Sequence, residues 1–278
     1  LGINNIFVET KNKFIVTEKV TFDLLGKIES GLLSNDAAFS TSTLLLGMVA
    51  QDQKLLESLS DESKKAITAV TKSMEKVIKD VVAEFPIELK NLVEMMNKSK
   101  NNFMQNHIAL VTHFSQEICR QQNWYSLELA SKLFMLTYFH DIILVPLYDK
   151  YPDAPRDEIA LKSYHKLSKE EAERVHLHPI LVSQLVRKLP SMPLGLDQLI
   201  LQHHGNFAGV VEDSLEPQEE IGQLAKVLYV AELFTGALMQ RGLPFTDEEY
   251  KVFLEALESK LAKKSYQKLI KPLYLLKV

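Results

Sequence analysis

The chain is poor in cysteine, since Cys119 is the only one among 278 residues. A disulfide within one chain needs two cysteines, and zinc or iron–sulfur sites built on thiolates need several. A single cysteine suits a reducing compartment. We therefore expect a cytoplasmic protein in which Cys119 is a small apolar residue on a helix face.

The chain also lacks an excess of positive charge. Its formal net charge is −4 at pH 7 and its pI is about 6.1, whereas proteins that bind long nucleic acids usually carry a strongly basic surface. The sequence therefore argues against a long nucleic-acid partner. A small phosphate-bearing ligand is compatible with it, because bound metal ions can supply local positive charge.

Long apolar runs are missing as well, since none approaches the ~18–20 residues that a membrane-spanning helix needs. The first residues, Leu1–Asn5, show neither the basic segment nor the apolar segment of a signal peptide. We therefore expect no membrane span.

What the chain has in abundance is helical periodicity. Hydrophobic residues make up 46% of it and charged residues 24%, the balance of a globular protein with a packed core. From about residue 88 onward, apolar residues recur at helical spacing almost throughout. We predict a mainly α protein with two parts. Residues 1–90 form a smaller N-terminal domain, mixed α/β or helical, with a regulatory or interaction role, and residues 91–278 form an all-helical metal-binding domain.

Local signals in the N-terminal part predict both strands and helices. The runs Ile6–Val8 and Phe14–Val16 are β-branched and aromatic and flank a turn-like cluster, which predicts a small hairpin. A helical pattern further on is interrupted near Gly47. Ser60 is a candidate N-cap of another helix, which Pro86 would end or restart.

In the C-terminal part, prolines and caps predict where helices break. Three prolines within residues 146–166 predict a loop or insertion. A capping box at Ser168–Glu171 starts a helix that ends before Pro179, where a second helix begins. A short helix over residues 196–204 and a longer one over residues 221–239 follow.

All eight histidines lie between His107 and His204. A lone histidine is usually a surface or core residue, but eight within 98 residues are less easily explained in that way, and they favour a metal site when they occur in ordered pairs. Three pairs stand out: His140-Asp141 after an apolar run, His178-Pro179, and His203-His204 on the predicted short helix. A charged Asp141 would be costly to bury without a partner, and coordination of a metal ion removes that cost.

The donors in these pairs are nitrogen and oxygen, without a thiolate. They suit iron, manganese or zinc better than an iron–sulfur cluster, calcium or magnesium. The remaining histidines are weaker candidates. His113, six residues after His107, could take the place of His107 as a ligand, whereas His165 and His176 are expected to be solvated.

The pairs belong to a longer series of motifs with regular spacing. His107-Ile-Ala-Leu-Val111 begins 33 residues before His140, and Leu167-Ser-Lys-Glu-Glu171 begins eleven residues before His178. Glu232, within Val-Ala-Glu-Leu-Phe, follows His204 by 28 residues. The series resembles the motifs of the HD-GYP family, the branch of HD-domain phosphohydrolases that hydrolyses cyclic di-GMP. The resemblance covers residues 107 to about 250.

The resemblance implies an HD-type helical bundle that holds two transition-metal ions, with iron favoured and manganese and zinc as alternatives. It implies that Asp141 is the bridging and catalytic carboxylate, and that Arg241, nine residues after Glu232, contacts a nucleotide phosphate. From the residues alone, Glu232 could instead pair with a lysine and Arg241 could be a surface cation. The implied ligands are His107, His140, Asp141 and Glu232 for one ion, and Asp141, His178, His203 and His204 for the other.

The chain departs from the family pattern mainly on the substrate side. Leu144 stands in place of the lysine that follows the His-Asp pair, and Gly205 in place of the glutamate after the His-His pair. Residues 206–211 replace the Gly-Tyr-Pro signature, the last acid is Glu232 instead of Asp, and the loop after the His-Asp pair is longer. A missing lysine removes one cation, and one such contact is worth a factor of about 10²–10³ in rate.

Two classes of function follow from the resemblance. The first is a binuclear-metal phosphodiesterase that hydrolyses cyclic di-GMP or a related nucleotide phosphodiester through a hydroxide that bridges the metal ions. The second is a catalytically weak or inactive receptor for a cyclic dinucleotide, or a protein-interaction module that acts through signalling partners. A hydrolase of linear nucleotides is a third, weaker option. A homodimer is compatible with each of them.

Overall fold

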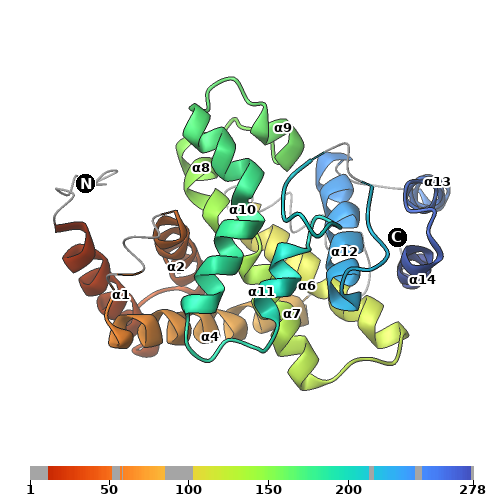
Figure 1. The fold of residues 1–278 in the computed structure, drawn as a ribbon. Coiled ribbons are helices and arrows are strands. Elements are labelled where there is room, and N and C mark those ends of the chain that lie inside the picture. Colours follow the sequence, from red (N-terminus) through yellow and green to blue (C-terminus); the bar gives the residue numbers. More distant parts are fainter. Residues whose placement is uncertain are drawn as a thin grey trace.

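The computed structural model of the protein describes residues 12–51, 57, 59–84, 103–212, 216–241 and 246–276. Within these residues every regular element is a helix and there is no strand (Figure 1), which confirms the mainly α prediction. The run Phe14–Val16 belongs to a helix, so the predicted hairpin is wrong there. Ile6–Val8 lies outside the described residues. Three β-branched or aromatic residues are a weak local preference, which tertiary packing overrides.

The described part of residues 1–90 is helical. The predicted N-cap at Ser60 is confirmed, since its Oγ accepts a hydrogen bond from the Ser63 backbone N–H at 3.1 Å. The predicted interruption at Gly47 is wrong, because one helix continues through it. Pro86 lies outside the described residues. The helices, which pack on one another, are α1 (Lys13–Glu29), α2 (Asn35–Ala50) and α4 (Asp61–Glu84).

The rest of the described chain forms shorter and longer helices that pack around α6 and α10. α6 packs against α7 and α12, and α10 packs against α11. Ser168 and Thr246 each form a capping box with the glutamate three residues later, as predicted for Ser168. The elements are α6 (Phe103–Gln121), α7 (Leu127–Phe139), η2 (Ile142–Leu144), α8 (Val145–Lys150), α9 (Glu158–Lys162), α10 (Lys169–Lys188), α11 (Leu196–Leu201), α12 (Gln223–Arg241), α13 (Asp247–Lys260), α14 (Lys264–Ile270) and η3 (Lys271–Leu275).

The predicted loop over residues 146–166 contains two short helices, α8 and α9. Pro146 stands in the first turn of α8, where its missing N–H would have had no helical partner. Asp157 caps α9, because its carboxylate accepts a hydrogen bond from the Ala160 backbone N–H at 2.8 Å. The loop prediction is therefore wrong at these helices and holds only for the turns between them.

Pro179 lies inside a single long helix, α10, and does not start a new one as predicted. A proline inside a helix leaves the carbonyl oxygen four residues earlier without its usual N–H partner. Here that oxygen belongs to Val175, and Nδ1 of His178 lies 2.8 Å from it. The histidine ring thus replaces the lost backbone hydrogen bond, which lets the helix continue.

Gly47 lets α2 approach the segment that follows the His-Asp pair. A Cβ atom at Gly47 would lie 2.5 Å from the Ile142 carbonyl oxygen and 2.8 Å from Cδ of Pro146. In the same contact, Nε2 of Gln51 donates a hydrogen bond to the Ile143 carbonyl oxygen at 2.9 Å. One hydrophobic core continues across both parts of the chain, from Leu24 to Leu276. The N-terminal helices therefore support the backbone that carries the candidate site.

Gly47→Ala is expected to lower the free energy of unfolding by about 1–3 kcal/mol, because the added methyl group overpacks this contact. The matched control is Gly26→Ala in α1, where a Cβ meets nothing within 4 Å. That change should stabilise the protein by up to about 1 kcal/mol through helix propensity. Chemical denaturation followed by circular dichroism measures both. Equal effects of the two substitutions would contradict the close approach of α2.

One segment is apolar enough on average to resemble a membrane-spanning helix. Leu127–Lys150 could cross a membrane by length and composition alone, although Lys132 and Asp141 interrupt its apolar runs. However, 78% of its apolar window is buried inside the protein. The segment covers α7, η2 and α8, which are core elements of the fold. It therefore gives no support to a membrane span, and the cytoplasmic location stays a prediction.

Candidate metal centre

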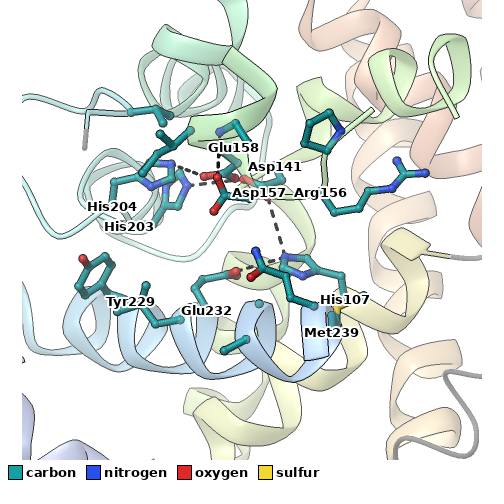
Figure 2. Close-up of a pocket in the computed structure, with 18 of the residues that line it drawn as sticks. His107, Asp141, Arg156, Asp157, Glu158, His203, His204, Tyr229, Glu232 and Met239 are labelled. Carbon is teal, nitrogen blue, oxygen red and sulfur yellow. Dashed lines mark hydrogen bonds and ion pairs between the residues drawn. The ribbon is translucent and has the colours of Figure 1, made fainter. Parts of the chain in front are cut away.

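Histidine and carboxylate side chains from six parts of the chain lie close together. They come from α6, the end of α7, α9, α10, the turn after α11, and α12. Figure 2 shows those that line the adjoining pocket, among them His107, Asp141 and Glu232. The structure brings together all seven residues of the predicted ligand set: His107, His140, Asp141, His178, His203, His204 and Glu232.

A first group of donors lies where α6, α7 and α12 meet. His107 Nε2 lies 3.4 Å from His140 Nε2 and 3.2 Å from Glu232 Oε2. His140 Nε2 lies 2.7 Å from Glu232 Oε1. His107, His140 and Asp141 are all buried, and their ligand atoms lie within 4.8 Å of one another, so this group could hold a metal ion.

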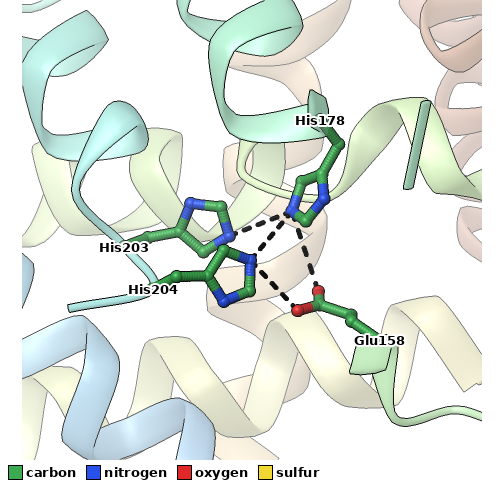
Figure 3. A group of neighbouring side chains, drawn as sticks. All are labelled: Glu158, His178, His203 and His204. Atoms are coloured by element: carbon green, nitrogen blue, oxygen red, sulfur yellow. Dashed lines mark hydrogen bonds and ion pairs between the residues drawn. The ribbon is translucent and has the colours of Figure 1, made fainter. Parts of the chain in front are cut away.

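A second group lies where α10, the turn after α11, and α9 meet (Figure 3). His178 Nε2 lies 3.1 Å from His203 Nε2 and 3.2 Å from His204 Nε2. Glu158 Oε2 lies 3.1 Å from His204 Nε2. These four side chains also offer donor atoms within 4.8 Å of one another and could hold a metal ion.

Asp141 lies between the two groups and turns one oxygen to each (Figure 2). Its Oδ2 lies 3.4 Å from His140 Nε2 and 3.9 Å from His107 Nε2. Its Oδ1 lies 3.1 Å from His178 Nε2 and 3.6 Å from His203 Nε2. A carboxylate in this position can bind two ions at once, as the resemblance implied.

Three of the histidines have one ring nitrogen occupied by a backbone carbonyl. The Nδ1 atoms of His140, His178 and His203 lie 2.6–2.8 Å from the carbonyl oxygen three residues earlier. A carbonyl oxygen only accepts hydrogen bonds, so Nδ1 carries the hydrogen and, in the neutral ring, Nε2 has a lone pair. Metal-bound histidines are oriented by such outer hydrogen bonds.

When the rings of His178 and His203 are neutral, their Nε2 atoms face each other as acceptors at 3.1 Å, which is unfavourable unless a cation lies between them. Two buried carboxylate oxygens, Asp141 Oδ1 and Glu232 Oε1, accept no hydrogen bond from the protein while the neighbouring histidines are neutral. Unpaired buried acceptors are costly. A cation would satisfy both the histidine Nε2 atoms and these carboxylate oxygens. Imidazole nitrogen with carboxylate oxygen is a donor set for transition metals. The residues present fit metal ions on these grounds.

The electrostatics favour the ionised form of Asp141 and Glu232, whereas burial and the charges of these two acids hold the pKa of Glu158 well above its usual range. Burial alone would raise the pKa of Asp141, but His140, His178 and His203 outweigh it and hold that pKa well below its usual range. Burial likewise opposes ionisation of Glu232, yet the neighbouring His107 and His140 lower its pKa to about 2. Both acids are thus ready to bind a cation at neutral pH.

The histidines divide between neutral and charged forms. Burial and the neighbouring histidines hold the pKa of His204 well below its ordinary value, and burial lowers that of His203. Burial would also lower the pKa of His140, but Asp141 and Glu232 outweigh it and raise this pKa to about 9. Metal binding at His140 would therefore release a proton.

His203 and His204 were predicted to lie on a short helix, and this prediction is wrong. They lie in the turn that follows α11. On a helix, adjacent side chains diverge by about 100°. In the turn, the two rings lie 4.0 Å apart between centroids. The turn therefore directs both rings toward His178, which a continued helix would not do.

Glu158 is a member of the second group that sequence reasoning missed. It lies in the segment that was predicted as a loop, and no spacing connects it to the histidines. The only local signal is the Asp157-Glu158 pair before an apolar Ile159-Ala160-Leu161, which predicts a helix start and no more.

Several other candidates lie outside the two groups. His113, on α6, is buried against Phe114 and belongs to neither group. His165 is exposed, as predicted, and His176 is half-buried with Nδ1 2.9 Å from the Val211 carbonyl oxygen. The side chain of Arg241 lies outside the described part of the structure, so its predicted contact with phosphate stays a prediction.

A cavity of about 800 Å³ opens beside the donor groups, within the size range of small-molecule sites. Aromatic and apolar side chains such as Phe103, Tyr148 and Tyr229 form part of its wall. The guanidinium of Arg156 lies 4.8 Å from the Phe103 ring centroid and 4.7 Å from that of Tyr148, and Figure 2 shows it directed away from the cluster.

Charged residues around the cavity are mostly acidic. Among the described residues that line it, the basic ones are Arg156 and Lys260. Leu144, which replaces the lysine of the resemblance, is fully buried in the core and supplies no charge. The acidic lining residues are Asp141, Asp157, Glu158, Glu212, Glu216 and Glu232.

Comparison with known proteins adds no family assignment. No protein-family model matches the chain, and neither a curated protein nor a solved structure is significantly similar to it.

Proposed function

We propose that the protein is a two-metal hydrolase of phosphodiesters, acting on cyclic di-GMP or a related nucleotide. The observation that carries the proposal is the position of Asp141, with one carboxylate oxygen toward each of two histidine groups. Paired sites of this kind serve phosphatases and nucleases. The resemblance of the motif series to HD-GYP proteins supports the choice of substrate.

The protein's own residues would hold and orient the reactants. When bound, two transition-metal ions lower the pKa of water toward neutrality and offset charge on the phosphoryl oxygens. Asp141 would set the separation of the two positions, and the backbone contacts of His140, His178 and His203 would keep the donor atoms directed inward. The aromatic walls of the cavity would exclude water and stack against bases.

The test is turnover of cyclic di-GMP by protein loaded anaerobically with ferrous iron, followed by chromatography. We expect linear nucleotide products from the wild type and a rate at least about 100-fold lower for His178→Gln, since even outer-shell metal partners are worth 10–100-fold. The matched control, His165→Gln, changes an exposed histidine outside both groups and should keep the wild-type rate. No turnover by the iron-loaded wild type would refute the hydrolase.

The composition of the cavity wall supports a second candidate, a receptor that binds a cyclic dinucleotide with little or no turnover. The described lining has few cations to stabilise a phosphoryl group during reaction, and Leu144 offers none. Isothermal titration calorimetry in parallel with the turnover assay separates the two candidates. Binding without product selects the receptor.

A further inference from the structure

Glu158 reaches the second donor group from outside the series of histidine motifs. It is the first residue of α9, in the segment that lengthens the connection after His140-Asp141. Figure 3 shows its carboxylate directed at His178 and His204. Oε2 lies 3.1 Å from His204 Nε2, and Oε1 lies 3.8 Å from His178 Nε2.

The position of Glu158 is held by contacts on both sides of it. The Asp157 carboxylate caps α9, so the register of the helix start is set. Three residues later Leu161 is completely buried in the core, and Nζ of Lys162 donates a hydrogen bond to the Val211 carbonyl oxygen at 3.1 Å. α9 also packs on α10, the helix that carries His178.

Glu158 has no lysine or arginine partner in the part of the chain that the structure describes. Its polar contacts there are with His178 and His204 and with Asp141. Burial and the charge of Asp141 hold the pKa of Glu158 well above its usual range, and a bound cation would offset that charge. Only about a fifth of its side chain is exposed, 18%. A carboxylate that is mostly buried among histidine Nε2 atoms is suited to sharing a cation with them.

We propose that Glu158 is a ligand of the metal ion held by His178, His203 and His204, an inference that rests on the proposed two-metal function. This ion would then have five protein donors, namely the three histidines, Asp141 Oδ1 and Glu158. The other ion would have four, from His107, His140, Asp141 Oδ2 and Glu232.

The two ions would therefore differ in how much room they leave for substrate. An ion with more protein donors has fewer positions open, and catalytic sites keep an open position. The cavity is lined by members of both groups, so the choice between the ions rests on the number of protein donors, and the substrate phosphoryl group would bind at the ion of His107 and Glu232. Glu158 would slow the loss of the other ion and leave it fewer positions for substrate.

The experiment measures metal alone on the full chain. Wild type and Glu158→Gln are loaded anaerobically with ferrous iron, analysed for iron per chain, and then mixed with a coloured iron chelator. We expect two ions in the wild type, and in E158Q one ion that is released at least about 10-fold faster. The matched control is Glu216→Gln, a cavity acid outside both donor groups, which should release iron as the wild type does.

Equal release from E158Q, E216Q and the wild type would overturn the role of Glu158 and leave the two-metal function intact. A wild type that binds no iron would overturn both. Circular dichroism of the metal-free proteins checks that each variant folds. If E158Q does not fold, Glu158→Asp keeps a carboxylate and should fold, with release faster than the wild type. Wild-type release from E158D would then overturn the proposal, since a shorter side chain cannot keep the same contact.

Discussion

Asp141→Ala is expected to abolish the binding of both metal ions. The two oxygens of Asp141 face different donor groups, with Oδ1 3.1 Å from His178 Nε2 and Oδ2 3.4 Å from His140 Nε2. Removal of the carboxylate takes one donor from each group and also removes the negative charge between them. Two buried cations would then lie near each other with less negative charge to offset their repulsion, which is strongly unfavourable.

Glu232→Gln provides the matched comparison, because Glu232 pairs with His107 and His140 of the first group alone. We expect E232Q to lose one ion and D141A to lose two, with turnover by D141A falling at least about 10³-fold. Elemental analysis after gel filtration gives the number of ions per chain, and circular dichroism confirms folding. Retention of one full ion by D141A would refute the bridging position.

Removal of metal is expected to weaken nucleotide binding by at least about 100-fold, or ~2.7 kcal/mol. Without metal ions, six acidic residues and two basic ones line the described part of the cavity. Asp141 and Glu232 are ionised at neutral pH, because nearby histidines outweigh burial and lower the pKa of each. A phosphodiester would therefore meet like charge, and a mismatched charge of this kind costs several kcal/mol.

Calorimetry with cyclic di-GMP measures this effect on iron-loaded protein and on protein treated with a chelator. Iron added back should restore binding, which excludes irreversible unfolding as the cause. A second titration at higher salt should recover part of the affinity of the metal-free protein, because salt screens repulsion between partly exposed charges. Equal affinity with and without metal would mean that the nucleotide does not bind through the ions.

Much of the fold could be predicted from local patterns. The long helices α6 and α7 and the capping box at Ser168 follow from apolar periodicity and cap chemistry, which act over a few residues. The errors occur where a local preference conflicts with packing. Phe14–Val16 is helical although its residues favour strands, and α10 continues through Pro179 because His178 satisfies the carbonyl that proline leaves open.

In the candidate site too, some features follow from local sequence patterns and others depend on tertiary packing. The motif series from His107 to Glu232 was sufficient to select seven residues that the tertiary structure brings together, while their role as ligands stays a prediction. Each motif puts its donor at a helix end or on a helix face, so order and spacing carry the information. Glu158 carries no such signal, because its position depends on how α9 packs against α10.

The sequence by itself determined the mainly helical class, since composition, periodicity and caps are properties of neighbouring residues, and its motifs selected seven histidine and carboxylate residues as candidate metal donors. The tertiary structure decided which donors share a group, how Asp141 divides its oxygens between them, and that Glu158 joins the second. Those facts depend on distances between residues far apart in the chain. Such distances are set by packing of whole helices, as where Gly47 allows α2 to reach the backbone after Asp141.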